Sequence, residues 1–243
     1  MPRSSVVRLS WIVAGAFILA TALVYVDRLN LVATPPDLSA SNMVDRALGS
    51  LAYRQAIWPI FLWTNLLFGI GFVAAVAFAA TVAARLGLRG TSVFVVFAAV
   101  GGVIGAIAST IPIGAVNSAV WLPYCDCGFK ETEIVAQQWA GIVASDISDW
   151  LNRVAGVVLA IGLYALVQDA GARIPSRLRG WTLITAVALV LASVVATISP
   201  PGLDDIVNVL TSLIGAVLIP VWAVWLARTV DASSGENSPA GGT

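Results

Sequence analysis

Long apolar runs separated by short polar segments dominate the pattern of hydrophobic and polar positions along the chain. Six of these runs are long enough to cross about 30 Å of hydrocarbon as a helix that rises about 1.5 Å per residue. The pattern predicts an all-α, polytopic transmembrane helix bundle. The six predicted spans cover approximately residues 11–26, 57–84, 91–114, 151–170, 181–199 and 206–228.

The two ends of the chain call for separate interpretation. Arg3 and Arg8 precede the first apolar run, and Ala20-Thr21-Ala22 resembles a signal-peptide cleavage site, but the apolar run continues past it, so a retained first span is expected. Residues 231–243 are rich in Ser, Gly, Pro and Ala and have no apolar face to bury. We expect them to form a disordered cytoplasmic tail after a single membrane domain of residues 1–230.

The composition agrees with a membrane protein and excludes several classes of function. Of 243 residues, 59% are apolar and 11% are charged, which does not suit a water-soluble surface. The formal net charge is zero and the basic residues are dispersed, so no nucleic-acid partner is expected. Histidine is absent, which removes the usual metal and haem ligand and the usual acid or base near neutral pH. We expect no catalytic residues, no metal site and no cofactor, with the lipid bilayer as surroundings.

The distribution of basic residues predicts the orientation of the spans. Cytoplasmic loops of membrane proteins carry the excess of Lys and Arg. With the N-terminus inside, the cytoplasmic segments hold eight basic residues and the outer segments five. Both termini are therefore expected in the cytoplasm, with the chain in the cytoplasmic membrane of a bacterium.

Tryptophans fall near the ends of the predicted spans, as amphipathic rings do at headgroup depth. They are expected to form two belts rather than a ligand cage. The inner belt would hold Trp11, Trp181, Trp222 and Trp225, and the outer belt Trp58, Trp63, Trp121, Trp139 and Trp150.

Small residues and one proline interrupt the apolar spans. In the third span, Ala98, Gly102 and Ala106 recur at the four-residue spacing that lets helices approach closely, which predicts a central position or a dimer seam. In the last span, Pro220 should loosen the helix and free a carbonyl group that a neighbour must satisfy.

Polar side chains inside the spans are the main evidence on function, because such groups are costly in hydrocarbon and turn toward partners or a wet cavity. They lie in the outer third of three spans and predict a polar, outward-opening vestibule. Its candidate residues are Thr64, Asn65, Asp149, Asn152, Arg153, Asp205, Asn208, Thr211 and Ser212.

The same polar residues have a purely structural alternative. Ser145 or Ser148 would be a good N-cap for the fourth span, and the acidic residues that follow would complement the helix dipole. Asp149 and Arg153 would then form an ordinary i,i+4 pair, and Asp204 and Asp205 would start the sixth span.

Both cysteines lie in the outer loop between the third and fourth spans, as Cys125-Asp126-Cys127. In an oxidising compartment they are expected to form a disulfide within the chain or between chains. A redox role is less favoured, because thiol exchange generally uses a C-x-x-C pair and Asp126 opposes formation of the thiolate.

Three classes of function follow from these observations. A non-enzymatic membrane component or partner subunit is favoured, with a second copy of the chain or another membrane protein as the candidate partner. A small-solute or ion transporter or channel with the outward-facing vestibule is the first alternative. An extracytoplasmic thiol redox protein that uses Cys125 and Cys127 is the second.

Three segments resemble a bacterial family of uncharacterised six-helix integral membrane proteins. They are residues 149–168 (DWLNRVAGVVLAIGLYALVQ), residues 179–191 (RGWTLITAVALVL) and residues 219–230 (IPVWAVWLARTV). The resemblance covers most of the chain and implies a six-span topology. It implies no activity, and it does not extend to the loop that carries the two cysteines.

Overall fold

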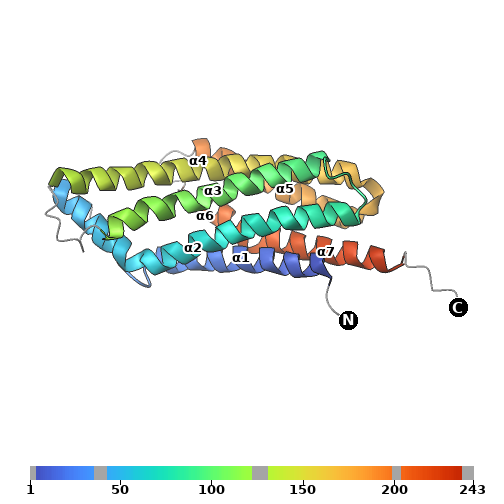
Figure 1. The fold of residues 1–243 in the computed structure, drawn as a ribbon, viewed down its shortest axis with the longest axis horizontal. Coiled ribbons are helices and arrows are strands. Elements are labelled where there is room, and N and C mark those ends of the chain that lie inside the picture. Colours follow the sequence, from blue (N-terminus) through green and yellow to red (C-terminus); the bar gives the residue numbers. More distant parts are fainter. Residues whose placement is uncertain (1–3, 36–42, 122–130, 199–203, 237–243) are drawn as a thin grey trace.

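The computed structural model describes residues 4–35, 43–121, 131–198 and 204–236, and these residues form a helical bundle without strands (Figure 1). A short 3₁₀ turn at Gly171–Arg173 and a π-helical segment at Ile214–Leu218 interrupt the α-helices. The α-helices are α1 (Ser5–Arg28), α2 (Met43–Arg85), α3 (Val93–Trp121), α4 (Glu131–Ala170), α5 (Ser176–Ile198), α6 (Asp204–Leu213) and α7 (Ile219–Glu236).

Six helices of the described chain are long and apolar enough to cross a membrane. Five of them are α1 to α5, and the sixth consists of α6, the π-helical segment and α7 in succession. The predicted fold class, an all-α bundle of six spans, is confirmed. The chain is a multi-pass membrane protein.

The helices form a ring in which neighbours in sequence are mostly neighbours in space. α1 packs between α2 and α7, and α3 packs between α2 and α4. α5 packs against α4 on one side and against α6 and α7 on the other. The first residues of α1 and the last residues of α7 lie at the same end of the bundle (Figure 1). The last span runs to Glu236, six residues into the tail that was expected to lack structure.

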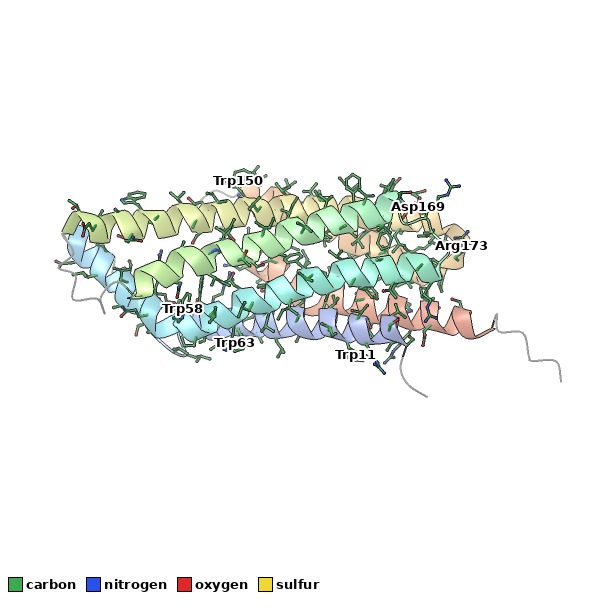
Figure 2. The ribbon with its side chains drawn as sticks, in the orientation of Figure 1. Trp11, Trp58, Trp63, Trp150, Asp169 and Arg173 are labelled. Carbon is green, nitrogen blue, oxygen red and sulfur yellow. The ribbon has the colours of Figure 1, made fainter. Side chains whose placement is uncertain are left out.

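Two helices are much longer than the spans predicted for them. α2 has 43 residues and α4 has 40, so each is about 60 Å long and about twice the thickness of the hydrocarbon. Residues 43–56 and 131–150 were expected to be outer loops, but they are helical. We call these two helical stretches the extension. The N-terminal part of α2 bends toward α4 (Figure 1), and Pro59 inside α2 removes a backbone donor near Trp58, which Figure 2 labels beside the bend.

Glycines allow α3 to pack closely against both of its neighbours. A Cβ atom on Gly101 would lie 2.8 Å from Leu159 of α4, and one on Gly105 would lie 2.6 Å from the ring of Phe72 on α2. A Cβ atom on Gly102 would lie 3.1 Å from the carbonyl oxygen of Phe72. The small-residue pattern therefore serves close contacts within the bundle. α3 lies between α2 and α4 in the ring and not at its centre, and its outer face is exposed.

The half of the bundle near the chain termini is filled by large apolar side chains. Phe78 and Leu226 are fully buried there, and the rings of Phe78 and Trp222 meet edge to face at 5.7 Å. The indole N–H of Trp222 donates to the hydroxyl of Thr182 at 3.1 Å. Trp222 was expected in the inner tryptophan belt, but it is 7% exposed and belongs to the core. Its hydrogen bond explains how it can be buried, since the indole N–H finds a partner inside the bundle.

The labelled tryptophans lie at two levels along the bundle. Figure 2 shows Trp11 near the end that carries Asp169 and Arg173, and Trp58, Trp63 and Trp150 farther toward the other end. Trp11, Trp63 and Trp150 are exposed, as residues in contact with lipid headgroups should be.

Candidate functional site

A cavity of about 570 Å³ lies inside the ring of helices, toward the end where α1, α3 and α5 finish and α6 begins. All six spans contribute to its wall. Its volume falls in the range of sites that hold small molecules, which is about 300–1,000 Å³. The opposite half of the bundle is packed with the large apolar side chains described above.

The structure brings most of the candidate vestibule residues together around this cavity. Ser212 is the exception among the described side chains, because it does not belong to the wall; the side chain of Asp205 lies outside the described residues. The candidate residues that line the cavity are Thr64 and Asn65 of α2, Asp149, Asn152 and Arg153 of α4, and Asn208 and Thr211 of α6.

The wall also contains polar residues that the sequence analysis did not place there. Asp27 and Arg28, at the end of α1, contribute a carboxylate and a guanidinium group. Ser109 of α3, Ser148 of α4 and Ser193 of α5 contribute hydroxyl groups. Asp27 and Arg28 directly follow the first apolar run at the same end of the bundle as the predicted stripes, and that position was the available signal.

Hydrogen bonds fix the charged residues of α1 at the rim of the cavity. The hydroxyl of Tyr53, on α2, donates to Asp27 Oδ1 at 2.8 Å. Arg28 Nη2 donates to Asn208 Oδ1 at 2.5 Å, which ties α1 to α6. These two charged groups therefore have partners within the protein.

Asp149 and Arg153 are one helical turn apart on α4 and face the same cavity. Among the described residues, none donates a hydrogen bond to the Asp149 carboxylate and none forms an ion pair with Arg153. The Arg153 guanidinium instead lies over the ring of Trp150, 5.0 Å from its centroid. The direct i,i+4 ion pair of the structural alternative is not formed, although the two opposite charges attract each other, and both groups line the cavity wall.

The proposed N-cap of the fourth span is also wrong. Ser145 and Ser148 lie well inside α4, which begins at Glu131. The Ser145 hydroxyl donates to the carbonyl oxygen of Gly141 at 2.9 Å, and the Ser148 hydroxyl donates across to that of Ala108 on α3 at 2.8 Å. A helix start therefore does not explain Asp149 on α4. α6 does begin at Asp204, as expected for the sixth span.

Three phenylalanines form the floor of the cavity. Phe17 of α1 meets Phe68 and Phe72 of α2 edge to face, with ring centroids 5.9 Å and 5.4 Å apart. Phe17 and Phe72 also line a second void of about 50 Å³, on the side of the packed core, which Thr185 borders. These two rings, together with Leu159, Leu189 and Ile219, therefore border both the large cavity and the much smaller one beneath it.

The wall formed by the last span contains the π-helical segment that precedes Pro220. The backbone N–H of Ile219 donates to the carbonyl oxygen of Ile214, five residues back. The Trp181 indole N–H of α5 donates to the carbonyl oxygen of Leu218 at 3.4 Å, two residues before Pro220. The carbonyl group that Pro220 deprives of its helical donor is that of Ala216, four residues back, so its partner stays a prediction. Ile214, Gly215 and Ile219 line the cavity, which places the irregular backbone directly at the site.

Metal and thiol chemistry receive no structural support from the described residues. Within ranges 4–35, 43–121, 131–198 and 204–236, no three His, Cys, Asp or Glu side chains gather as metal ligands. Cys125 and Cys127 lie outside the described residues.

Comparison of the chain with protein-family models, curated proteins and solved structures gives no match. The resemblance to a family of six-helix membrane proteins therefore stays an expectation, and any function has to be argued from the cavity itself.

Proposed function

We propose that the protein binds a small solute in the cavity, as the first step of transport across the membrane. The observation that carries this proposal is the convergence of charged and amide side chains from α1, α2, α4 and α6 on one cavity inside an otherwise apolar bundle. Such groups are costly within a membrane and generally mark a pathway or a binding site. Side chains that served only to link helices would be expected to form direct contacts with a partner. Asp149 and Arg153 attract each other electrostatically, but neither forms a side-chain hydrogen bond or a direct ion pair within the described residues.

We further propose that the cavity opens to the outside of the cytoplasmic membrane. The basic residues favour an N-terminus and C-terminus in the cytoplasm, because the segments on that side hold eight of the thirteen. The cavity lining includes the last residues of α1, Asp27 and Arg28, and so lies toward the end of the bundle opposite the chain termini. Arg173 lies at the end near the termini (Figures 1 and 2).

A carrier fits this geometry better than an open channel. Phe17, Phe68 and Phe72 close the cavity on one side, and the apolar core fills the bundle beyond them. Passage would need a rearrangement of the helices. The π-helical segment and Pro220 mark the place in the wall where a helix is least regular, and π segments are frequent at functional sites.

Cysteine labelling tests both the cavity and its direction. In a background with Cys125→Ser and Cys127→Ser, a membrane-impermeant maleimide added to intact cells should label Asn152→Cys and Thr211→Cys, because thiols react as thiolates in water. Val154→Cys on the lipid-facing side of α4 should stay unlabelled. Arg177→Cys, which is exposed in the first turn of α5, should be labelled only in inverted vesicles.

The labelling distinguishes failure of the proposed solute site from failure of the proposed orientation. If neither Asn152→Cys nor Thr211→Cys reacts from either side, the cavity holds no water and the proposed function fails. If both react only in inverted vesicles, the solute site stands and the proposed orientation fails.

A second candidate is the non-enzymatic membrane component, and one observation favours it. The exposed apolar stripe of α4 continues into the extension, where Trp139, Val143 and Ile147 are 54%, 51% and 48% exposed. An apolar face beyond the hydrocarbon fits a second copy of this chain. If so, the protein reconstituted in nanodiscs should have the mass of a dimer, and Val143→Glu should make it a monomer. A monomeric wild-type protein would contradict this candidate.

A further inference from the structure

The charged groups of the cavity wall divide into an engaged pair and an available pair. Asp27 accepts a hydrogen bond from Tyr53, and Arg28 donates one to Asn208. Asp149 and Arg153, the other charged residues among the described lining, have no such partner in the described part of the chain. One carboxylate and one guanidinium are therefore left to meet a ligand.

The spacing of the available pair favours a ligand that carries both signs of charge. Four residues along a helix correspond to a rise of about 6 Å. A molecule with a cationic and an anionic group a few ångströms apart can satisfy both side chains at once. An ion with one charge gains the attraction of one side chain and meets the repulsion of the other, so the pair selects against it.

The phenylalanine floor of the cavity favours a ligand that also has an apolar part. Phe17, Phe68 and Phe72 present their rings to the cavity, and Leu159 and Leu189 border it at the same depth. A fully polar solute would leave this surface in contact with water, whereas a hydrocarbon chain or ring would cover it. Charged groups on one part of the wall and aromatic rings on the floor match an amphipathic molecule.

We propose that the cavity binds a zwitterionic amphiphile, with its cationic group at Asp149, its anionic group at Arg153 and its apolar part on the phenylalanine floor. This inference rests on the proposed function, since it names the class of solute for the same cavity. A phospholipid from the outer leaflet and a free solute from outside share this chemistry.

The first test measures the preference for a zwitterion. The full chain is reconstituted in nanodiscs of phosphatidylglycerol, and binding of hexylphosphocholine below its micellar concentration is measured by calorimetry, with empty nanodiscs as the blank. Hexyltrimethylammonium and hexyl phosphate are the matched probes with one charge. The zwitterion should bind at least about tenfold more tightly than either. Equal or weaker binding of the zwitterion would overturn the inference.

Two variants assign the charges to their side chains. Asp149→Asn should weaken hexylphosphocholine binding at least about tenfold and retain or strengthen hexyl phosphate binding, because the repelling carboxylate is gone. Arg153→Gln should weaken hexylphosphocholine binding equally and retain or strengthen hexyltrimethylammonium binding, because the repelling guanidinium is gone. The retained binding shows that each variant is folded. Asp169→Asn and Arg177→Gln, which change exposed charges outside the cavity, should bind all three probes as the wild type does. Wild-type affinity for the zwitterion in both cavity variants would also overturn the inference.

A competition experiment distinguishes the two sources of the ligand. Together with the cysteine labelling, the binding measurements also distinguish failure of this inference from failure of the proposed function. Nanodiscs that contain phosphatidylcholine should compete with the soluble probe if the ligand is a membrane lipid, and should leave its binding unchanged if the ligand is a free solute. Either result supports a zwitterionic site. If the cavity cysteines are labelled from outside but no preference for a zwitterion is found, this inference fails and the proposed function stands.

Discussion

Replacing Gly102 with leucine should prevent the bundle from assembling correctly. A Cβ atom at this position of α3 would meet the side chain of Val76 and would lie 3.1 Å from the carbonyl oxygen of Phe72. A backbone oxygen cannot turn aside as a flexible side chain can, so α2 and α3 would have to separate. Overpacking costs about 1–3 kcal/mol even for small additions. We expect Gly102→Leu to lose a monodisperse peak in detergent and Gly102→Ala to show a clearly lower melting temperature.

The control for this prediction lies on the same helix. No heavy atom lies within 4 Å of a Cβ atom built on Gly114, so Gly114→Leu adds the same side chain without a clash. It should keep the melting temperature and the elution profile of the wild type. Equal stability of Gly102→Leu and Gly114→Leu would show that α2 and α3 do not pack as closely as the structure describes.

The spans were predictable because the hydrocarbon of a membrane imposes a simple requirement on each of them. Every stretch that crosses it needs about twenty predominantly apolar residues, and the apolar runs of the sequence supply six such stretches. No comparable requirement governs the extension. Residues 131–148 contain acidic, amide and apolar residues mixed together, and hydropathy does not distinguish a water-exposed helix of this kind from a loop.

The polar wall was predictable where a single helix carries the pattern. Asp149, Asn152 and Arg153 are spaced by three and four residues, so a helix places them on one face whatever surrounds it. Ser212 shows the limit of this argument, because it lies about 100° around the helix from Thr211, and only the neighbouring helices decide which of the two faces the cavity.

Residues contributed through the arrangement of the helices could not be predicted from periodicity. Asp27 and Arg28 reach the cavity because α1 packs beside the last span, where Arg28 meets Asn208, 180 positions later in the chain. Ser148 was interpreted as an N-cap because a Ser followed by acidic residues is typical of a helix start. Its true partner is a carbonyl group of α3, which only the packed structure brings within reach.

Removing the Phe17 ring should connect the large cavity with the void beneath it. Thr185 borders that void and is fully buried. In a background that lacks Cys125 and Cys127, Thr185→Cys alone should therefore resist a membrane-impermeant maleimide added from outside. With Phe17→Ala in the same chain, the phenylalanine floor loses the ring that meets both Phe68 and Phe72, and Thr185→Cys should become labelled. Deleting a buried phenylalanine ring also costs about 3–5 kcal/mol of stability.

That loss of stability requires a control with a similar loss, because a loosened bundle would admit the reagent at other places too. Phe78 is fully buried among the apolar core residues, packs against Trp222 and lines neither cavity. Phe78→Ala should lower the melting temperature by a similar amount and leave Thr185→Cys unlabelled. Labelling in the Phe78→Ala chain, or no labelling in the Phe17→Ala chain, would show that Phe17 does not close the cavity. Labelling only with Phe17→Ala would identify this ring as the barrier between the large cavity and the void beneath it, which a solute would have to pass in the proposed transport.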